Sequence, residues 1–202
     1  ATCLKTGLTA GEHCSRCDYK IAQQIVPKTD HVYGADGTCE FCGESKYVVT
    51  FELNSDGKGY TVAGLKKKAT ITNGVLIIPG MYNNLPVTEI KATAFRPEYD
   101  YGTEHKIKKV IIEEGVLQIN GGAFENCDNI EEVSLPKSLT RICYYAFANC
   151  EKLKEIVIPA KVVYLESHTF NYCTSLKKVT ILGDINTSEA AGTAFEGCLN
   201  IE

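Results

Sequence analysis

Apolar and polar residues recur in a fixed order along most of the chain. Each repeat has an aliphatic residue, two mostly charged residues and then a strand-like triplet with apolar first and third positions. The triplets begin at Val110, Val133, Ile156 and Val179, which lie 23 residues apart. Alternation of this kind over a short run predicts a β-strand with one buried face. The pattern therefore predicts one short strand in each repeat.

Three other positions share this period. A phenylalanine recurs at Phe95, Phe124, Phe147, Phe170 and Phe195. A cysteine follows each of the last four phenylalanines by three residues, at Cys127, Cys150, Cys173 and Cys198. An aliphatic residue follows each of the same four phenylalanines by six residues, at Ile130, Leu153, Leu176 and Ile201. A period of roughly 20–29 residues with a Leu-x-x-Leu-x-Leu core is typical of leucine-rich repeats. We therefore predict a repeat solenoid with a period of about 23 residues, in which short β-strands alternate with helical or irregular convex segments.

The repeat cysteines are expected to be core residues rather than a redox or metal site. Successive repeats stack about 4.8 Å apart, so residues at one repeat position form a ladder inside the stack. A buried cysteine behaves there as a small hydrophobic residue.

The pattern divides the chain into three parts. Residues 1–44 lack hydrophobic periodicity and form a cysteine-rich module. Residues 45–79 alternate and contain glycines at a turn, which predicts a β-hairpin that caps the solenoid, followed by the first strand. Residues 80–202 form the repeats. The chain stops at Ile201-Glu202, where Ile201 is the aliphatic position that would open another repeat, as expected for a fragment or a frayed end.

The cysteine-rich module is predicted to hold a structural zinc ion. Two Cys-x-x-Cys pairs, Cys14/Cys17 and Cys39/Cys42, are separated by 21 residues, close to the spacing of a zinc ribbon with four thiolate ligands. Cys3, Cys14, Cys17 and His31 are a competing ligand set. Disulfides are the rival explanation in an exported protein, and free thiols are a third. With four protein ligands, the zinc would leave no open position for catalysis.

Insertions into the period predict surface loops, which often lie on a binding face. About five extra residues fall at residues 80–84, six within residues 96–106, and two around residues 186–191. The second insertion is the most binding-like, because Tyr99 and Tyr101 lie outside the apolar repeat positions and Arg96 stands beside them.

The outward strand positions determine what the concave face of the solenoid offers. The outward position just before each triplet is charged, with a lysine in the first and last of the four repeats and a glutamate in the two between. They are Lys109, Glu132, Glu155 and Lys178. A row of mixed charge is better suited to binding a protein than to binding a polyanion.

Composition limits the function further. The net charge of −4 gives no electrostatic footprint for nucleic acid, and no apolar stretch is long enough for a membrane helix. No nucleophile motif, dinucleotide loop or calcium loop is present, so no catalytic residues are predicted.

The repeat unit resembles the BspA-like leucine-rich repeat of bacterial surface proteins. Residues 130–150 carry the family pattern. Residues 84–95 match its lead-in, Gly-Leu-Pro-Val-Thr-x-Ile-x-x-x-Ala-Phe, with Asn84 at the glycine position. Cys143 stands where the family usually has glycine. The cysteine-rich start of the chain resembles modules of surface proteins from gut-type anaerobes. The resemblance implies an exported, non-enzymatic protein that binds host or matrix proteins.

We therefore expect a secreted or cell-surface interaction module that acts in protein binding and adhesion. The alternatives are an accessory domain of a larger exported enzyme and a structural spacer.

Overall fold

A computed structural model describes residues 7–8, 12–13, 20–21, 25–26, 32–40, 45–67, 69–97, 107–185 and 192–201. The chain divides into two units, Ala1–Lys46 and Tyr47–Glu202. In the first unit, β1 (Gly7–Leu8) pairs antiparallel with β4 (Ile25–Val26), and β2 (Glu12–His13) pairs antiparallel with β3 (Lys20–Ile21). An isolated bridge joins Tyr33 to Cys39.

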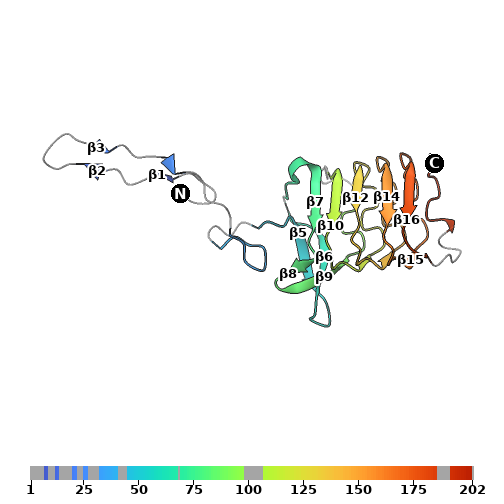
Figure 1. Ribbon diagram of the computed structural model, residues 1–202, viewed down its shortest axis with the longest axis horizontal. Coiled ribbons are helices and arrows are strands. Elements are labelled where there is room, and N and C mark those ends of the chain that lie inside the picture. Colours follow the sequence, from blue (N-terminus) through green and yellow to red (C-terminus); the bar gives the residue numbers. More distant parts are fainter. Residues whose placement is uncertain are drawn as a thin grey trace. The chain divides into compact units, whose positions relative to one another are not determined.

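One strand from each repeat joins a parallel stack in the second unit. The strands are β7 (Val75–Ile78), β10 (Lys109–Ile112), β12 (Glu132–Ser134), β14 (Glu155–Ile158) and β16 (Lys178–Ile181). They run side by side in chain order (Figure 1). Val110 is in register with Leu76 and Val133, and Ile156 is in register with Val179. The solenoid with a 23-residue period predicted from the sequence is confirmed.

A second parallel stack occupies the positions where helical or irregular segments were expected. It contains β9 (Leu85–Ile90), β11 (Gln118–Ile119), β13 (Arg141–Ile142) and β15 (Tyr164–Leu165). Residues 107–185 contain no helix, so the helical part of the prediction was wrong. Tight turns joined by hydrogen bonds between repeats take its place, since 23 residues per repeat leave little chain for a helix.

The second stack begins with a hairpin. β5 (Val49–Leu53) pairs antiparallel with β6 (Tyr60–Leu65), and β6 then pairs parallel with β9. The insertion at residues 80–84 is a second hairpin, in which β8 (Met81–Tyr82) folds back on β9. Asn83 and Asn84 have φ values of 49° and 62°, as a two-residue turn between twisted strands requires.

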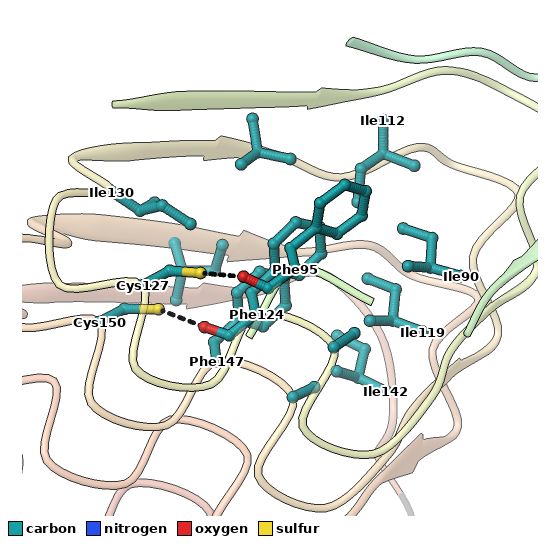
Figure 2. Packing of buried hydrophobic residues seen from close by; sticks show 14 of the residues in the cluster. Ile90, Phe95, Ile112, Ile119, Phe124, Cys127, Ile130, Ile142, Phe147 and Cys150 are labelled. Carbon is teal, nitrogen blue, oxygen red and sulfur yellow. Dashed lines mark hydrogen bonds between the residues drawn. The ribbon is translucent and has the colours of Figure 1, made fainter. Parts of the chain in front are cut away.

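The core lies between the two stacks and contains a column of phenylalanine rings (Figure 2). Phe95, Phe124, Phe147 and Phe170 are almost completely buried. Successive ring centroids are 4.9, 5.1, 5.4 and 5.3 Å apart, ending at Phe195, and the rings are nearly parallel. Each of the first four rings belongs to a turn whose amide donates to a carbonyl of the next repeat, for example Phe147 N to Thr169 O at 2.8 Å. The phenylalanine turns therefore form a third ladder along the solenoid.

The repeat cysteines lie beside this column. Cys127, Cys150 and Cys173 are buried, as predicted, and Cys198 is half-buried. Each thiol also donates a hydrogen bond to the carbonyl of the phenylalanine one repeat earlier, as Figure 2 shows for Cys127 and Cys150. The four Sγ–O distances lie between 3.0 and 3.4 Å. The thiol thus satisfies a buried carbonyl as well as filling space.

The phenylalanine turns use left-handed backbone on both sides of the ring. Two residues before a ring, Thr93, Tyr145 and His168 have φ values of 58°, 56° and 59°. Two residues after a ring, Asn149 and Tyr172 have φ values of 57° and 53°. Asparagine tolerates this region, whereas a β-branched residue such as Thr93 is strained in it. The stacked turns hold these residues in place.

Candidate functional site

The outward side chains of β7, β10, β12, β14 and β16 form one continuous surface, which we call the long-strand face. Residues on these strands alternate between core and solvent because successive side chains of a strand point to opposite sides. Val110, Ile112, Ile156 and Ile158 are buried. Their neighbours Lys109, Ile111, Glu155 and Val157 are half-buried or exposed.

Apolar side chains run across the middle of the long-strand face. Ile77 is 44% exposed and Val157 is 47% exposed. Ile111 lies between them, because β10 pairs with β7 and with β12, and β12 lies against β14. Ser134 is in register with Ile111, and its small side chain interrupts the strip. A depression of about 150 Å³ lies here, lined by Lys109, Glu132, Val133, Ser134, Glu155, Ile156 and Val157. The face therefore offers aliphatic side chains to solvent beside a hollow that a partner's side chain could fill.

A charged row borders this strip. Lys109 Nζ lies 2.6 Å from Glu132 Oε2, and Glu155 is in register with Lys178. Beside this row, Lys154 donates a hydrogen bond to Glu131 at 3.1 Å, and that bond lowers the pKa of the Glu131 carboxyl. The four predicted residues Lys109, Glu132, Glu155 and Lys178 thus lie on one surface in the predicted order. Whether they bind a partner stays a prediction.

The other predicted binding residues are only partly described. Arg96 forms an ion pair with Glu125 of the next repeat, at 3.1 Å, which fixes the start of the inserted loop. Tyr99 and Tyr101 lie outside the described residues, and so does His105.

The zinc prediction also falls largely outside the described chain. Cys14, Cys17 and Cys42 lie there, as do the alternative ligands Cys3 and His31. Cys39 is described and is buried. No group of three or more potential metal ligands occurs among the described residues. Zinc binding by the N-terminal module stays a prediction.

Two of the buried repeat thiols, Cys127 and Cys150, are unreactive in this arrangement. Burial raises the pKa of the Cys127 thiol to about 12 and raises that of Cys150 well above its usual range. A thiol reacts as its thiolate, so these groups are protonated and unreactive at neutral pH. This supports a packing role for the cysteine ladder.

A cluster of exposed aromatic residues on the second stack was missed in the sequence. Tyr144 and Tyr164 are 55% and 52% exposed, and Arg141 is in register with Tyr164. The sequence could have revealed this cluster, because Arg141 and Tyr164 are one 23-residue period apart and residues one period apart lie side by side.

Solved structures with a similar fold are leucine-rich-repeat proteins. A protein from Bacteroides capillosus is 27% identical, with a TM-score of 0.57 over 69% of this chain and 98% of its own. The Treponema pallidum protein TpLRR is 22% identical, with a TM-score of 0.55 over 76% of this chain and 77% of its own. A Bacteroides ovatus protein is 24% identical, with a TM-score of 0.52 over 76% of this chain and 44% of its own.

The repeats themselves identify the family. No curated protein matches the chain. Residues 88–202 match the family described as "BspA type Leucine rich repeat region", in six copies. This segment contains the long strands from β10 onward, the short strands from β11 onward and the phenylalanine column. The chain therefore belongs to the BspA-type leucine-rich-repeat family.

Proposed function

We propose that the chain is a non-enzymatic protein-binding module, and that its ligand docks on the long-strand face. The observation that carries the proposal is the apolar strip of exposed Ile77 and Val157 and half-buried Ile111, beside the depression at Ser134. Aliphatic side chains left in water on a rigid sheet are stabilised when a partner covers them. The hollow at Ser134 gives such a partner a place for an anchoring side chain.

The charges around the strip favour a protein over a polyanion or a membrane. Lys109 and Lys178 stand at the ends of the row, with Glu132 and Glu155 between them. A partner of mixed charge can pair with both signs, which sets orientation and association rate more than affinity. A polyanion would meet the two central carboxylates.

We further propose that the module works outside the cell, in adhesion to host or matrix proteins. Its support is the resemblance of the repeats to those of bacterial surface proteins. Among the described residues, no helix is long and apolar enough to cross a membrane. The inserted loop with Tyr99 and Tyr101 is a second proposed contact.

The test is retention of the protein on immobilised extracellular-matrix proteins and enzymatically deglycosylated mucin. Val157→Asp places a charge in the apolar strip and should weaken binding to a retained ligand at least tenfold. Val163→Asp is the matched control, because Val163 is similarly exposed, at 43%, but lies outside the long strands. It should bind like the wild type. Tyr99→Ala with Tyr101→Ala measures the contribution of the loop.

Three outcomes would contradict the proposal. The wild type could bind none of these proteins, Val157→Asp could bind at full strength, or Val163→Asp could lose as much affinity as Val157→Asp. Full binding by Val157→Asp together with loss in the loop variant would move the site to the inserted loop.

A further inference from the structure

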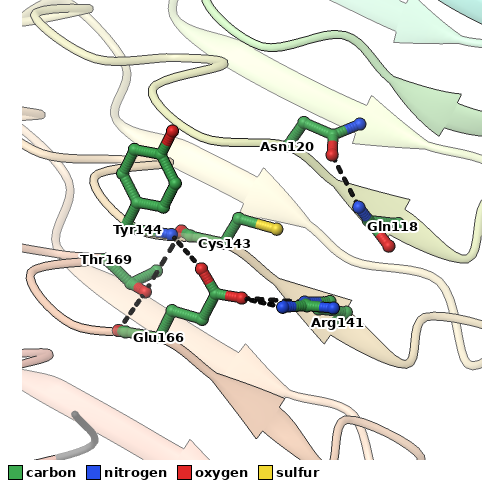
Figure 3. A network of polar contacts seen from close by, with 7 residues as sticks. All are labelled: Gln118, Asn120, Arg141, Cys143, Tyr144, Glu166 and Thr169. Atoms are coloured by element: carbon green, nitrogen blue, oxygen red, sulfur yellow. Dashed lines mark hydrogen bonds and ion pairs between the residues drawn. The ribbon is translucent and has the colours of Figure 1, made fainter.

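A second surface, built on β13 and β15, combines exposed aromatic rings with fixed planar polar groups. We call it the aromatic flank and define it by Gln118, Arg141, Tyr144, Tyr145, Tyr164 and Glu166. Its residues come from adjacent repeats: Gln118 is in register with Arg141, and Arg141 with Tyr164. Figure 3 shows Glu166 joined to Arg141 and to the Tyr144 backbone. These residues have no part in the long-strand face.

The tyrosine rings of the flank are held by their surroundings. Tyr144 lies over Gly121 of the preceding repeat, where a Cβ atom would stand only 2.7 Å from the ring. Tyr145 stacks on His168 with centroids 5.0 Å apart, and Arg141 lies over the Tyr164 ring at 5.5 Å. Tyr144 and Tyr164 are nevertheless more than half exposed. The rings therefore offer apolar surface to a ligand at a low entropic cost, because little side-chain freedom is left to lose.

The polar groups between the rings are also fixed in place. Arg141 donates to Glu166 at 2.8 Å, and the second carboxylate oxygen accepts the Tyr144 amide at 3.0 Å (Figure 3). Gln118 donates to the Asn120 side chain at 2.6 Å. A guanidinium has five N–H groups and a carboxylate has about four acceptor positions. Arg141 and Glu166 thus retain hydrogen-bonding capacity beyond their mutual pair.

The one cation and the one carboxylate of the flank are paired with each other, as Arg141 contacts Glu166. An ionic ligand would have to compete with this pair. A neutral ligand with hydroxyl groups could use the remaining donors and acceptors without breaking it.

We propose that the aromatic flank binds a neutral oligosaccharide. A pyranose ring has an apolar C–H face, which packs on an aromatic ring, and hydroxyl groups at its rim, which hydrogen-bond to planar amide, guanidinium and carboxylate groups. Tyr144 and Tyr164 supply the rings for this ligand. Gln118, Arg141 and Glu166 supply the planar polar groups beside them.

The experiment titrates the whole chain with cellohexaose, maltohexaose, mannohexaose, xylohexaose and chitohexaose. Tyrosine fluorescence and saturation-transfer NMR report binding, and the absence of tryptophan leaves the tyrosine signal unobscured. We expect at least one of these sugars to bind. Tyr144→Ala with Tyr164→Ala should weaken that binding at least tenfold, whereas Tyr144→Phe with Tyr164→Phe should change it less than threefold because the rings remain.

Two further variants separate ring contact from loss of folding. Gly121→Ala keeps every flank side chain but displaces the Tyr144 ring, and should weaken sugar binding. Val157→Asp, on the long-strand face, should leave sugar binding unchanged. Circular dichroism and thermal unfolding of each variant verify that it folds.

The proposal is overturned if none of the five sugars binds, or if the folded double alanine variant binds as the wild type does. It is also overturned if that variant loses binding to deglycosylated mucin or a matrix protein while no sugar binds. That last result would make the flank a protein-binding surface. Failure of Val157→Asp to affect protein binding would count against the long-strand face alone.

Discussion

Replacing a central phenylalanine by alanine should destabilise the solenoid more than the same replacement at its C-terminal end. Phe147 is fully buried, between Phe124 at 5.1 Å and Phe170 at 5.4 Å. A buried Phe→Ala change costs about 3–5 kcal/mol, and each aromatic pair contributes about 0.5–1.5 kcal/mol beyond buried area. With two pairs lost, we expect Phe147→Ala to cost about 4–5 kcal/mol, at the upper end of that range.

Replacing Phe195 by alanine should cost less free energy of unfolding. It is half-buried and stacks only on Phe170, at 5.3 Å, among the described residues. Less apolar area and one pair are removed, so Phe195→Ala should cost about 2 kcal/mol. Phe170→Ala is the matched control, because Phe170 has rings on both sides and should resemble Phe147→Ala.

Urea unfolding followed by circular dichroism and tyrosine fluorescence gives these free energies, provided that the slope with denaturant is the same in all variants. Equal losses at Phe147 and Phe195 would refute the reasoning, because stability would not depend on the number of stacked neighbours. A loss at Phe170 as small as that at Phe195 would do the same.

Three other changes have defined outcomes. Thr93→Gly should stabilise the chain by about 1 kcal/mol in the same assay, because φ is 58° there and glycine carries no Cβ strain; a destabilised variant would contradict this. Native Cys127 should resist Ellman's reagent at pH 8, because its pKa is about 12. Its contribution to stability should be lost as pH rises from 9 towards 12, since the unfolded thiol ionises first; a flat difference between wild type and Cys127→Ala over that range would argue against it. Protein purified without added metal should contain one zinc per chain, held by Cys14, Cys17, Cys39 and Cys42; absence of zinc together with absence of free thiols would favour disulfides.

Sequence periodicity was sufficient to predict the long strands and their core. Each strand contributes an inward-facing aliphatic residue at a fixed offset, and that offset gives the parallel register of Val110 with Val133 and of Ile156 with Val179. The phenylalanine column could be predicted for the same reason.

The second strand stack could not be predicted in this way. β11, β13 and β15 are only two residues long, which is too short for an alternating pattern. Their strand conformation depends on pairing with the neighbouring repeats. The thiol-to-carbonyl hydrogen bonds were missed because a hydrophobic pattern reports burial but not the partner of a polar atom.

The aromatic flank shows a different limit. Tyr144 and Tyr164 occupy repeat positions that hold Gly121 and Arg141 one repeat earlier. They are therefore absent from any consensus of the repeats. Residues that differ between equivalent positions of successive repeats, 23 residues apart, indicate surface sites. Residues that are the same at those positions indicate the core.

The most direct test of the proposed role is the affinity of a retained matrix protein or deglycosylated mucin for Val157→Asp and Val163→Asp, measured side by side by surface plasmon resonance. Our account predicts at least a tenfold higher Kd for Val157→Asp, which corresponds to about 1.4 kcal/mol, and an unchanged Kd for Val163→Asp. An unchanged Kd for the folded Val157→Asp variant would contradict the assignment of protein binding to the long-strand face.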